Sequence, residues 1–135
     1  MVKISDNEVE FLFGTNDYDK AAAIMKEKYD IRLILITLGP DGSRAYYDGI
    51  RAEAAPFLTD KTIETTGAGD TFCANAIDYV LNHGLDGLTE KDLVKLLTFA
   101  NAAASLVTTR KGALRVMPTR EEVMAFINES GRTLD

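Results

Sequence analysis

The stretch that decides the fold is Ile63–Ala74, IETTGAGDTFCA, in which two glycines and a carboxylate come directly before an apolar helical pattern. A helix start exposes backbone N–H groups that lack an internal partner, and the helix dipole favours negative charge there. Glycine leaves the backbone open to a phosphate, so Gly67-Ala68-Gly69 can form an anion hole for a phosphoryl group in transfer. Asp70 can then accept the proton of a substrate hydroxyl.

A second interpretation of the same stretch stays open. Glycine and aspartate are common at helix starts, so the segment can also be a simple turn in which Asp70 only complements its helix. The segment is not a Walker A loop, because no Gly-Lys-Ser/Thr follows the glycines.

Strand and helix patterns alternate in the first third of the chain. We expect a short strand at residues 2–4 and a short helix at Asn7–Phe13 that ends at Gly14. A second helix is predicted over about residues 17–29, with Asn16 as its N-cap.

A buried strand and a hairpin are predicted next. The apolar, β-branched run Arg32–Gly39, RLILITLG, is typical of a strand that is buried on both faces. The dipeptides Asp41-Gly42 and Asp48-Gly49 favour turns, with SRAYY and IRAEA as the strands between and after them.

The second half of the chain is predicted to be mostly helical. An apolar periodicity runs from Asp70 to His83, and Gly84 can end that helix. Two capping-box patterns, which precede a buried helix over 93–107 and a last amphipathic helix, are Thr89 with Asp92 and Thr119 with Glu122. Together the patterns predict an α/β fold with helices packed on a sheet.

Composition limits the classes of partner. The chain has 135 residues, of which 46% are hydrophobic, and this makeup is typical of one soluble globular domain. A net charge of −6 argues against nucleic-acid and anionic-membrane surfaces, so we expect small-molecule partners. No segment is long enough to span a membrane, and Cys73 is the single cysteine. We therefore expect a cytoplasmic protein.

A second glycine-rich stretch, Thr37-Leu38-Gly39-Pro40-Asp41-Gly42, follows the best candidate for a parallel strand. Open α/β sheets place their ligand crevices at the carboxyl ends of such strands, so nucleotide phosphates can bind here. An ordinary hairpin turn built on Pro40-Asp41-Gly42 is the alternative.

Four segments in order, namely KISDNE, TLGPDG, ETTGAGDTF and FANAAASLVTTRKGA, resemble the C-terminal half of the ribokinase/fructokinase (PfkB) family of carbohydrate kinases. The resemblance covers nearly the whole chain, and its most specific motif is Thr-Thr-Gly-Ala-Gly-Asp. It implies a ribokinase-like, Rossmann-like three-layer α/β/α fold, of which residues 1–135 are the nucleotide-binding part. It also implies transfer of the γ-phosphoryl group of ATP to a sugar hydroxyl, with fructose favoured because KISDNEVEFLFG resembles fructokinases.

The resemblance also implies roles for individual residues. Asp70 matches the family's catalytic base, and Gly67, Ala68 and Gly69 match its anion hole. Glu8 matches the acidic residue that helps to organise Mg²⁺, with a solvated helix charge as the alternative. The residues implied in nucleotide binding are Ser5, Thr37, Gly39, Pro40, Asp41, Gly42, Gly69 and Asn101. For Asn101, which falls where the family lines the base pocket, a hydrogen-bonded core amide is the alternative.

A monovalent-cation site, with K⁺ as the candidate, is implied beside Arg110-Lys111-Gly112-Ala113. Its implied residues are Val107, Arg110 and Gly112, together with the strand end from Glu64 to Thr66. The family usually has Asp where Glu64 stands, and this longer side chain changes or abolishes the cation site. Ser5 stands where the family usually has Asn, which weakens or replaces one nucleotide contact.

Family members are roughly twice as long as this chain, and the part without a counterpart here supplies most sugar contacts and the lid. We therefore expect half of an enzyme, and a nucleotide-binding fragment without catalytic activity of its own is the alternative function. Self-association that covers the sheet edge left by missing strands is a further expectation. His83 at a helix end and Cys73 in an apolar pattern are assigned no catalytic role.

Overall fold

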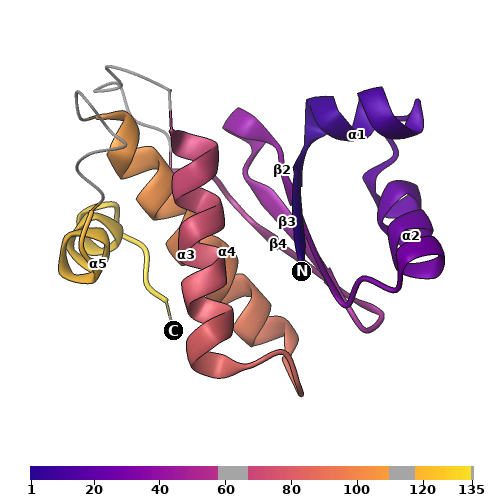
Figure 1. Ribbon diagram of the computed structural model, residues 1–135. Coiled ribbons are helices and arrows are strands. Elements are labelled where there is room, and N and C mark those ends of the chain that lie inside the picture. The colour runs from indigo at the N-terminus through magenta and orange to yellow at the C-terminus, as the bar shows by residue number, and fades with distance from the viewer. Residues whose placement is uncertain (58–66, 110–117, 135) are drawn as a thin grey trace.

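The computed structural model describes residues 1–57, 67–109 and 118–134 (Figure 1). The predicted positions in residues 58–66 and 110–117 lie outside the described residues. The described elements, in chain order, are β1 (Val2–Ser5), α1 (Asp6–Phe13), α2 (Tyr18–Tyr29), β2 (Leu33–Thr37), the 3-10 helix η1 (Gly39–Asp41), β3 (Ser43–Tyr47), β4 (Ile50–Ala54), α3 (Ala68–His83), α4 (Glu90–Thr108) and α5 (Arg120–Glu129).

The four strands form one mixed sheet in the order β1-β2-β3-β4. The β1 and β2 strands are parallel, whereas β2–β3 and β3–β4 are antiparallel hairpin pairs. The register aligns four residues in one row across the sheet, namely Ser5, Thr37, Ser43 and Ala54. This row crosses the sheet at the carboxyl ends of the two parallel strands, where a doubly wound fold binds its ligands.

Helices cover both faces of the sheet. In Figure 1, α1 and α2 lie on one side of the strands and α3 and α4 lie on the other. The sequence of β2 explains this arrangement, because its side chains alternate between the faces. Leu33 and Leu35 pack in the cluster with α3 and α4, whereas Ile34 and Ile36 pack in the cluster with α1 and α2. The predicted strand buried on both faces and the three-layer α/β/α architecture are confirmed.

A third apolar cluster joins the last helix to the rest. Val123 and Ile127 of α5 are fully buried against Ala102 and Ala103 of α4, together with Phe57. The small alanine side chains let the two helices approach closely. Both predicted capping boxes, at the starts of α4 and α5, are present and are confirmed.

Three predicted helix starts differ from the structure, and the first is that of α1, which begins at Asp6 rather than at Asn7. Asp17, and not Asn16, is the N-cap of α2, because its carboxylate accepts a 3.1 Å hydrogen bond from the Lys20 N–H. The Thr15 hydroxyl accepts a hydrogen bond of 3.0 Å from the Asp17 N–H, and this bond fixes the backbone just before α2. The α3 helix begins at Ala68, two residues before the predicted start at Asp70, so the glycine motif belongs partly to the helix itself.

Candidate functional site

A cavity of about 480 Å³ opens where the carboxyl ends of β1 and β2 face the start of α3 and one side of α4. Its walls come from segments that are far apart in the sequence. The residues that line it are Ser5, Asp6, Thr37, Gly39, Pro40, Gly42, Pro56, Phe57, Ala68, Gly69, Phe72, Asn101, Ala104, Ser105 and Thr108. The structure therefore brings together seven of the predicted nucleotide-binding residues, namely Ser5, Thr37, Gly39, Pro40, Gly42, Gly69 and Asn101.

Hydrogen bonds within the backbone fix the shape of the turn after β2. The Leu38 N–H donates to the Gly42 carbonyl at 2.8 Å, and the Gly42 N–H donates to the Gly39 carbonyl at 3.2 Å. Gly42 has φ +97°, and a Cβ atom there would lie 2.2 Å from the Ala54 carbonyl oxygen. Only glycine allows this approach, so the residue is required by the turn itself. The fifth predicted residue of the loop, Asp41, is exposed and does not line the cavity.

The glycine motif forms the start of α3. Gly67 is the N-cap in a left-handed conformation, with φ +87°, and the Thr71 N–H donates to its carbonyl at 2.9 Å. The helix itself provides no acceptor for the N–H groups of Ala68, Gly69 and Asp70. Ala68 and Gly69 line the cavity, so these donors border the space that a phosphate would enter.

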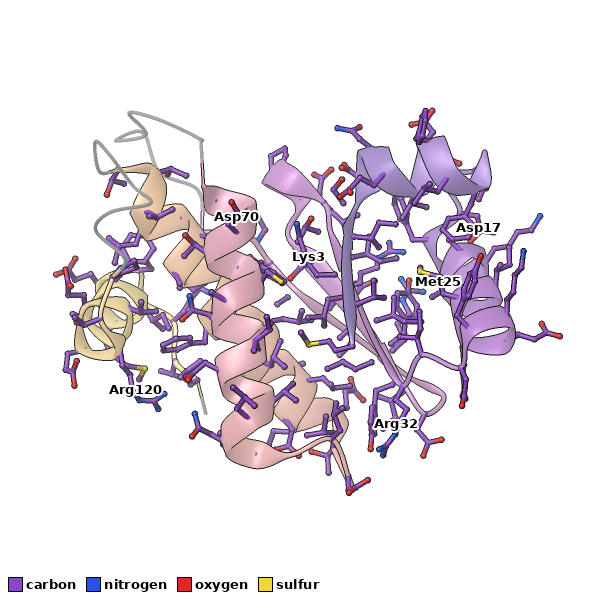
Figure 2. The ribbon with its side chains drawn as sticks, in the orientation of Figure 1. Lys3, Asp17, Met25, Arg32, Asp70 and Arg120 are labelled. Carbon is purple, nitrogen blue, oxygen red and sulfur yellow. The ribbon has the colours of Figure 1, made fainter. Side chains whose placement is uncertain are left out.

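Asp70 stands in the first turn of α3 with an exposed side chain at the upper end of the helix (Figure 2). It does not line the cavity, and neither does Gly67. The carboxylate is therefore open to solvent beside the cavity rather than within it.

Ser5 and Glu8 form the capping box of α1. The Glu8 carboxylate accepts from the Ser5 N–H at 2.9 Å, and the Ser5 hydroxyl accepts from the Glu8 N–H at 3.2 Å. These hydrogen bonds from Ser5 lower the pKa of Glu8. The exposed Glu8 side chain thus has a local structural role, whereas Ser5 also contributes to the cavity wall.

Asn101 connects α4 to the sheet. Its Oδ1 accepts from the Ser43 hydroxyl at 3.0 Å, and its Nδ2 donates to the carbonyls of Ala54 at 3.3 Å and Ala55 at 3.2 Å. These bonds engage both ends of the amide, so the predicted alternative of a hydrogen-bonded structural amide has direct geometric support. Asn101 still forms part of the cavity wall.

Sequence reasoning missed the rest of this wall. Ala104, Ser105 and Thr108 line the cavity together with Asn101, and their positions are i, i+3, i+4 and i+7 on α4. That spacing places four small residues on one helical face, a pattern that is visible in the sequence. The Ser105 hydroxyl donates to the Phe57 carbonyl, which holds the segment after β4 against the helix.

Most of the predicted cation-site residues cannot be placed. Glu64, Thr66, Arg110 and Gly112 lie outside the described residues. Val107 is described, and its side chain is fully buried in the last turn of α4. Within the described ranges, no group of three or more His, Cys, Asp or Glu side chains could hold a metal ion. The helices described here include none that is long and apolar enough to cross a membrane.

A second hollow, of about 310 Å³, lies between α2 and the β3–β4 hairpin. Its polar groups bond one another. The Tyr46 hydroxyl donates to Asp19 at 2.5 Å, and Arg51 donates to the other Asp19 oxygen at 2.9 Å. Burial, followed by the bond to Asp19, raises the pKa of Tyr46 to about 12. These bonds fasten α2 to the β3–β4 hairpin, and they occupy both carboxylate oxygens of Asp19.

Comparison with known proteins gives concordant results. The family model described as pfkB family carbohydrate kinase matches residues 1–120. "Probable fructokinase-2" of Arabidopsis thaliana is 35% identical over 127 residues, which cover 94% of this chain and 38% of that protein. The chain therefore spans about two fifths of the length of this relative.

Solved structures agree with the sequence match. A fructokinase from Vibrio cholerae O395 with fructose, ADP and calcium bound has 27% identity and a TM-score of 0.79, over 93% of this chain and 40% of that one. A double mutant of that fructokinase with fructose, ADP and potassium bound has 28% identity and a TM-score of 0.78, over 93% and 39%. The predicted ribokinase-like fold is confirmed by these likenesses.

Proposed function

Because this chain belongs to the pfkB family of carbohydrate kinases, we propose that it is the nucleotide-binding region of an ATP-dependent sugar kinase. Residues 1–135 act as one region in this proposal and correspond to the C-terminal part of the family's enzymes. Fructose is the favoured sugar, since the matched relatives are named fructokinases. The observation that carries the proposal is the cavity in which the Gly39–Gly42 turn, the start of α3 and the small-residue face of α4 meet.

The nucleotide enters this cavity with its phosphates toward the glycine-rich segments. Thr37, Gly39, Pro40 and Gly42 line the cavity at the end of β2, and Asp41 lies at the exposed outer edge of the turn. Asn101, Ala104 and Ser105 offer a flat wall of small side chains, which suits a planar base. Since Asn101 already bonds Ser43, it shapes this wall rather than reading the base by hydrogen bonds.

Phosphoryl transfer then takes place at the start of α3. The sugar hydroxyl oxygen forms a bond to the γ-phosphorus, the bond from that phosphorus to the β–γ bridging oxygen breaks, and ADP leaves. Asp70 accepts the hydroxyl proton, and the N–H groups of Gly67, Ala68 and Gly69 stabilise the charge on the phosphoryl oxygens. The open N–H groups and the exposed Asp70 carboxylate support these roles.

The residues present fit a magnesium ion that is held mainly by the nucleotide. Mg²⁺ in nucleotide sites keeps several waters and takes one or two carboxylates together with phosphate oxygens, so a cluster of three protein ligands is not needed. Glu8 uses one oxygen for its capping bond, and a carboxylate has further lone pairs for a metal-bound water. The ion would neutralise phosphate charge during transfer.

We also propose a potassium site. The support is the potassium-bound relative and the sequence pattern, in which the carbonyl of Val107 joins Glu64, Thr66, Arg110 and Gly112. Four of these five residues lie outside the described part of the chain.

A second candidate function is a nucleotide-binding fragment that has no catalytic activity of its own. The share of the relatives that this chain spans, about two fifths, favours it, because a separate sugar site needs further residues. The two candidates differ in turnover and agree in nucleotide binding.

The test is an ADP-release assay across a panel of sugars, run on this chain and on the longest native form of the protein. The kinase proposal expects sugar-dependent ADP release by the longest form, highest with fructose. Release that does not depend on sugar in either form, with Mg-ATP still bound, would favour the binding fragment. Absence of Mg-ATP binding by both forms would contradict both candidates.

A further inference from the structure

Lys3 lies in β1 and extends toward the start of α3. It pairs with Leu35 in the parallel register, and Leu35 packs in the core against α3 and α4. Partner residues in parallel strands point to the same face, so Lys3 also points toward these helices. Its Nζ atom lies 3.2 Å from the position that a Cβ atom would take on Gly69. Figure 2 shows the labelled Lys3 side chain between β1 and α3, below Asp70.

This placement is electrostatically unfavourable without an anion. A helix start carries partial positive charge, which repels a cation. Among residues 1–57, 67–109 and 118–134, the Lys3 ammonium forms no salt bridge, not even with Asp70 in the same helical turn. The bonds from Ser5 come first and the charge of Lys3 last among the causes that lower the pKa of Glu8, and the Glu8 carboxylate bonds the Ser5 N–H. A lysine beside the positive end of a helix goes against the usual preference for negative charge there, and such exceptions are typical of functional sites.

The cavity borders the start of α3 and the end of β1, and Lys3 lies next to this wall without being part of it. Ser5, two residues along β1 and on the same face as Lys3, lines the cavity, and so does Gly69. An anion at this wall would therefore contact the backbone donors of α3 on one side and be within reach of the flexible lysine on the other. A phosphate is the anion that matches both, since lysine binds phosphate oxygens as a point charge.

We propose that the Lys3 ammonium contacts the γ-phosphoryl group of the bound nucleotide and stabilises the charge on its oxygens during transfer. This proposal rests on the proposed kinase function and deepens it. The lysine gives up no proton and forms no covalent bond. Its charge adds to that of the backbone donors, and it distinguishes ATP from ADP because only ATP has the γ-phosphoryl group.

The test compares Lys3→Met with Lys3→Arg, and with Lys20→Met as a matched control on the exposed surface of α2. Mg-ATP and Mg-ADP affinities are measured by calorimetry on this chain, after the melting temperature of each variant has been recorded. We expect Lys3→Met to weaken ATP binding by roughly 10-fold or more and ADP binding by less than about 2-fold, because a lost charge-assisted contact is of that size. Lys3→Arg and Lys20→Met should keep the preference of the wild type.

Turnover gives a second measurement. In the longest native form, we expect Lys3→Met to lower kcat by roughly 100-fold or more, with little change in KM for the sugar, because the contact strengthens in the transition state. Wild-type ATP binding that Lys3→Met leaves intact, or equal losses for ATP and ADP, would overturn the role of Lys3 alone. If the wild type binds neither nucleotide in either form, the proposed function fails, and the role of Lys3 fails with it.

Discussion

The Ser43 hydroxyl donates a hydrogen bond of 3.0 Å to Oδ1 of Asn101, and this bond ties β3 to α4 at the wall of the cavity. Ser43 is 1% exposed, so in the native structure its buried hydroxyl is satisfied by Asn101 and not by water. Ser43 belongs to the row of aligned residues that crosses the sheet beside the cavity, and Asn101 lies on the helix that faces this row. Together with the bonds from Asn101 to the Ala54 and Ala55 carbonyls, it fastens this part of α4 to the sheet.

Removal of the Asn101 amide is expected to affect stability more than nucleotide binding. Asn101→Ala should lower the free energy of unfolding by about 1–3 kcal/mol, because it leaves the buried Ser43 hydroxyl without its acceptor. The thermal shift that Mg-ATP produces should change little. Asn75→Ala is the control, since the bond that Asn75 makes among the described residues goes to the Thr71 carbonyl of its own helix. A loss of the Mg-ATP shift with unchanged stability would show that Asn101 binds the base directly.

Asp70 is expected to control turnover. Asp70→Asn keeps the size of the side chain but removes most of its ability to accept a proton, so kcat of the longest native form should fall by roughly 10²–10⁴-fold. The dissociation constant for Mg-ATP should change little, because backbone donors and Mg²⁺ hold the phosphates. Asp78→Asn, exposed on the same helix, is the matched control.

A purely structural role of Asp70 predicts a different result. If this carboxylate only complements the dipole of α3, its replacement costs about 0.3–1 kcal/mol of stability and leaves turnover within a few-fold. Measurement of kcat, nucleotide affinity and melting temperature on one variant separates the two outcomes.

Gly42→Ala should damage the turn after β2. A new Cβ atom would overlap the Ala54 carbonyl oxygen, and φ +97° is already unfavourable for alanine. Gly49→Ala is the control, because Gly49 also has a positive φ, of +79°, but faces open space. We expect Gly42→Ala to be less stable than this control by about 1–3 kcal/mol in denaturant unfolding. Equal losses for the two variants would mean that the turn relaxes around the added methyl group.

The capping box of α4 should make stability depend on pH. The backbone N–H and the hydroxyl of Thr89 each donate to Asp92 at 3.0 Å, and these bonds lower the pKa of Asp92 in the folded state. A lowered folded-state pKa stabilises the protein above the ordinary pKa of aspartate, and this stability is lost as the pH falls through the folded-state pKa.

Asp92→Asn should therefore be destabilising by about 0.5–1 kcal/mol near neutral pH, with a difference from the wild type that shrinks as the pH falls below the ordinary pKa of aspartate. Glu90→Gln, which changes a charge in the same first turn, separates the capping bonds from the helix dipole. A pH-independent difference would contradict the capping explanation.

The isolated chain is expected to self-associate. Phe11 and Leu12 of α1 are 87% and 62% exposed, and Leu81 of α3 is 78% exposed. In the described sheet, β1 pairs with β2 alone, so one of its edges has no described neighbour. Light scattering should show a mass that rises with concentration, and Leu81→Lys should reduce it. A monomer at all concentrations would contradict this expectation.

Most of the fold could be predicted from local patterns. The alternation of β2 between two cores and the capping boxes at Thr89 and Thr119 depend on residues that are close together in the sequence. The N-cap of α2 was misplaced by one residue, because Asn16 and Asp17 have similar cap propensities and only the bond to Lys20 decides between them.

The sequence motifs of the candidate site could be predicted, whereas the contacts between residues that are far apart in the sequence could not. The glycine segments are local signals, and both reach the cavity. The bond from Ser43 to Asn101 and the approach of Lys3 to Gly69 join residues 58 and 66 positions apart, and no local pattern encodes such pairs. The capping box of Ser5 and Glu8 is different, because its residues are three positions apart and its Ser-x-x-Glu pattern is a local signal.

The central position of β2 affects how its backbone amide hydrogens exchange with solvent. Its strand neighbours on both sides and the apolar clusters on both faces shield its amide groups from solvent. Exchange of these amide hydrogens for deuterium therefore requires loss of both cores at once, and their protection should report the global free energy of unfolding. The cavity begins where β2 ends at Thr37, so its floor is anchored to the segment of the chain that opens last.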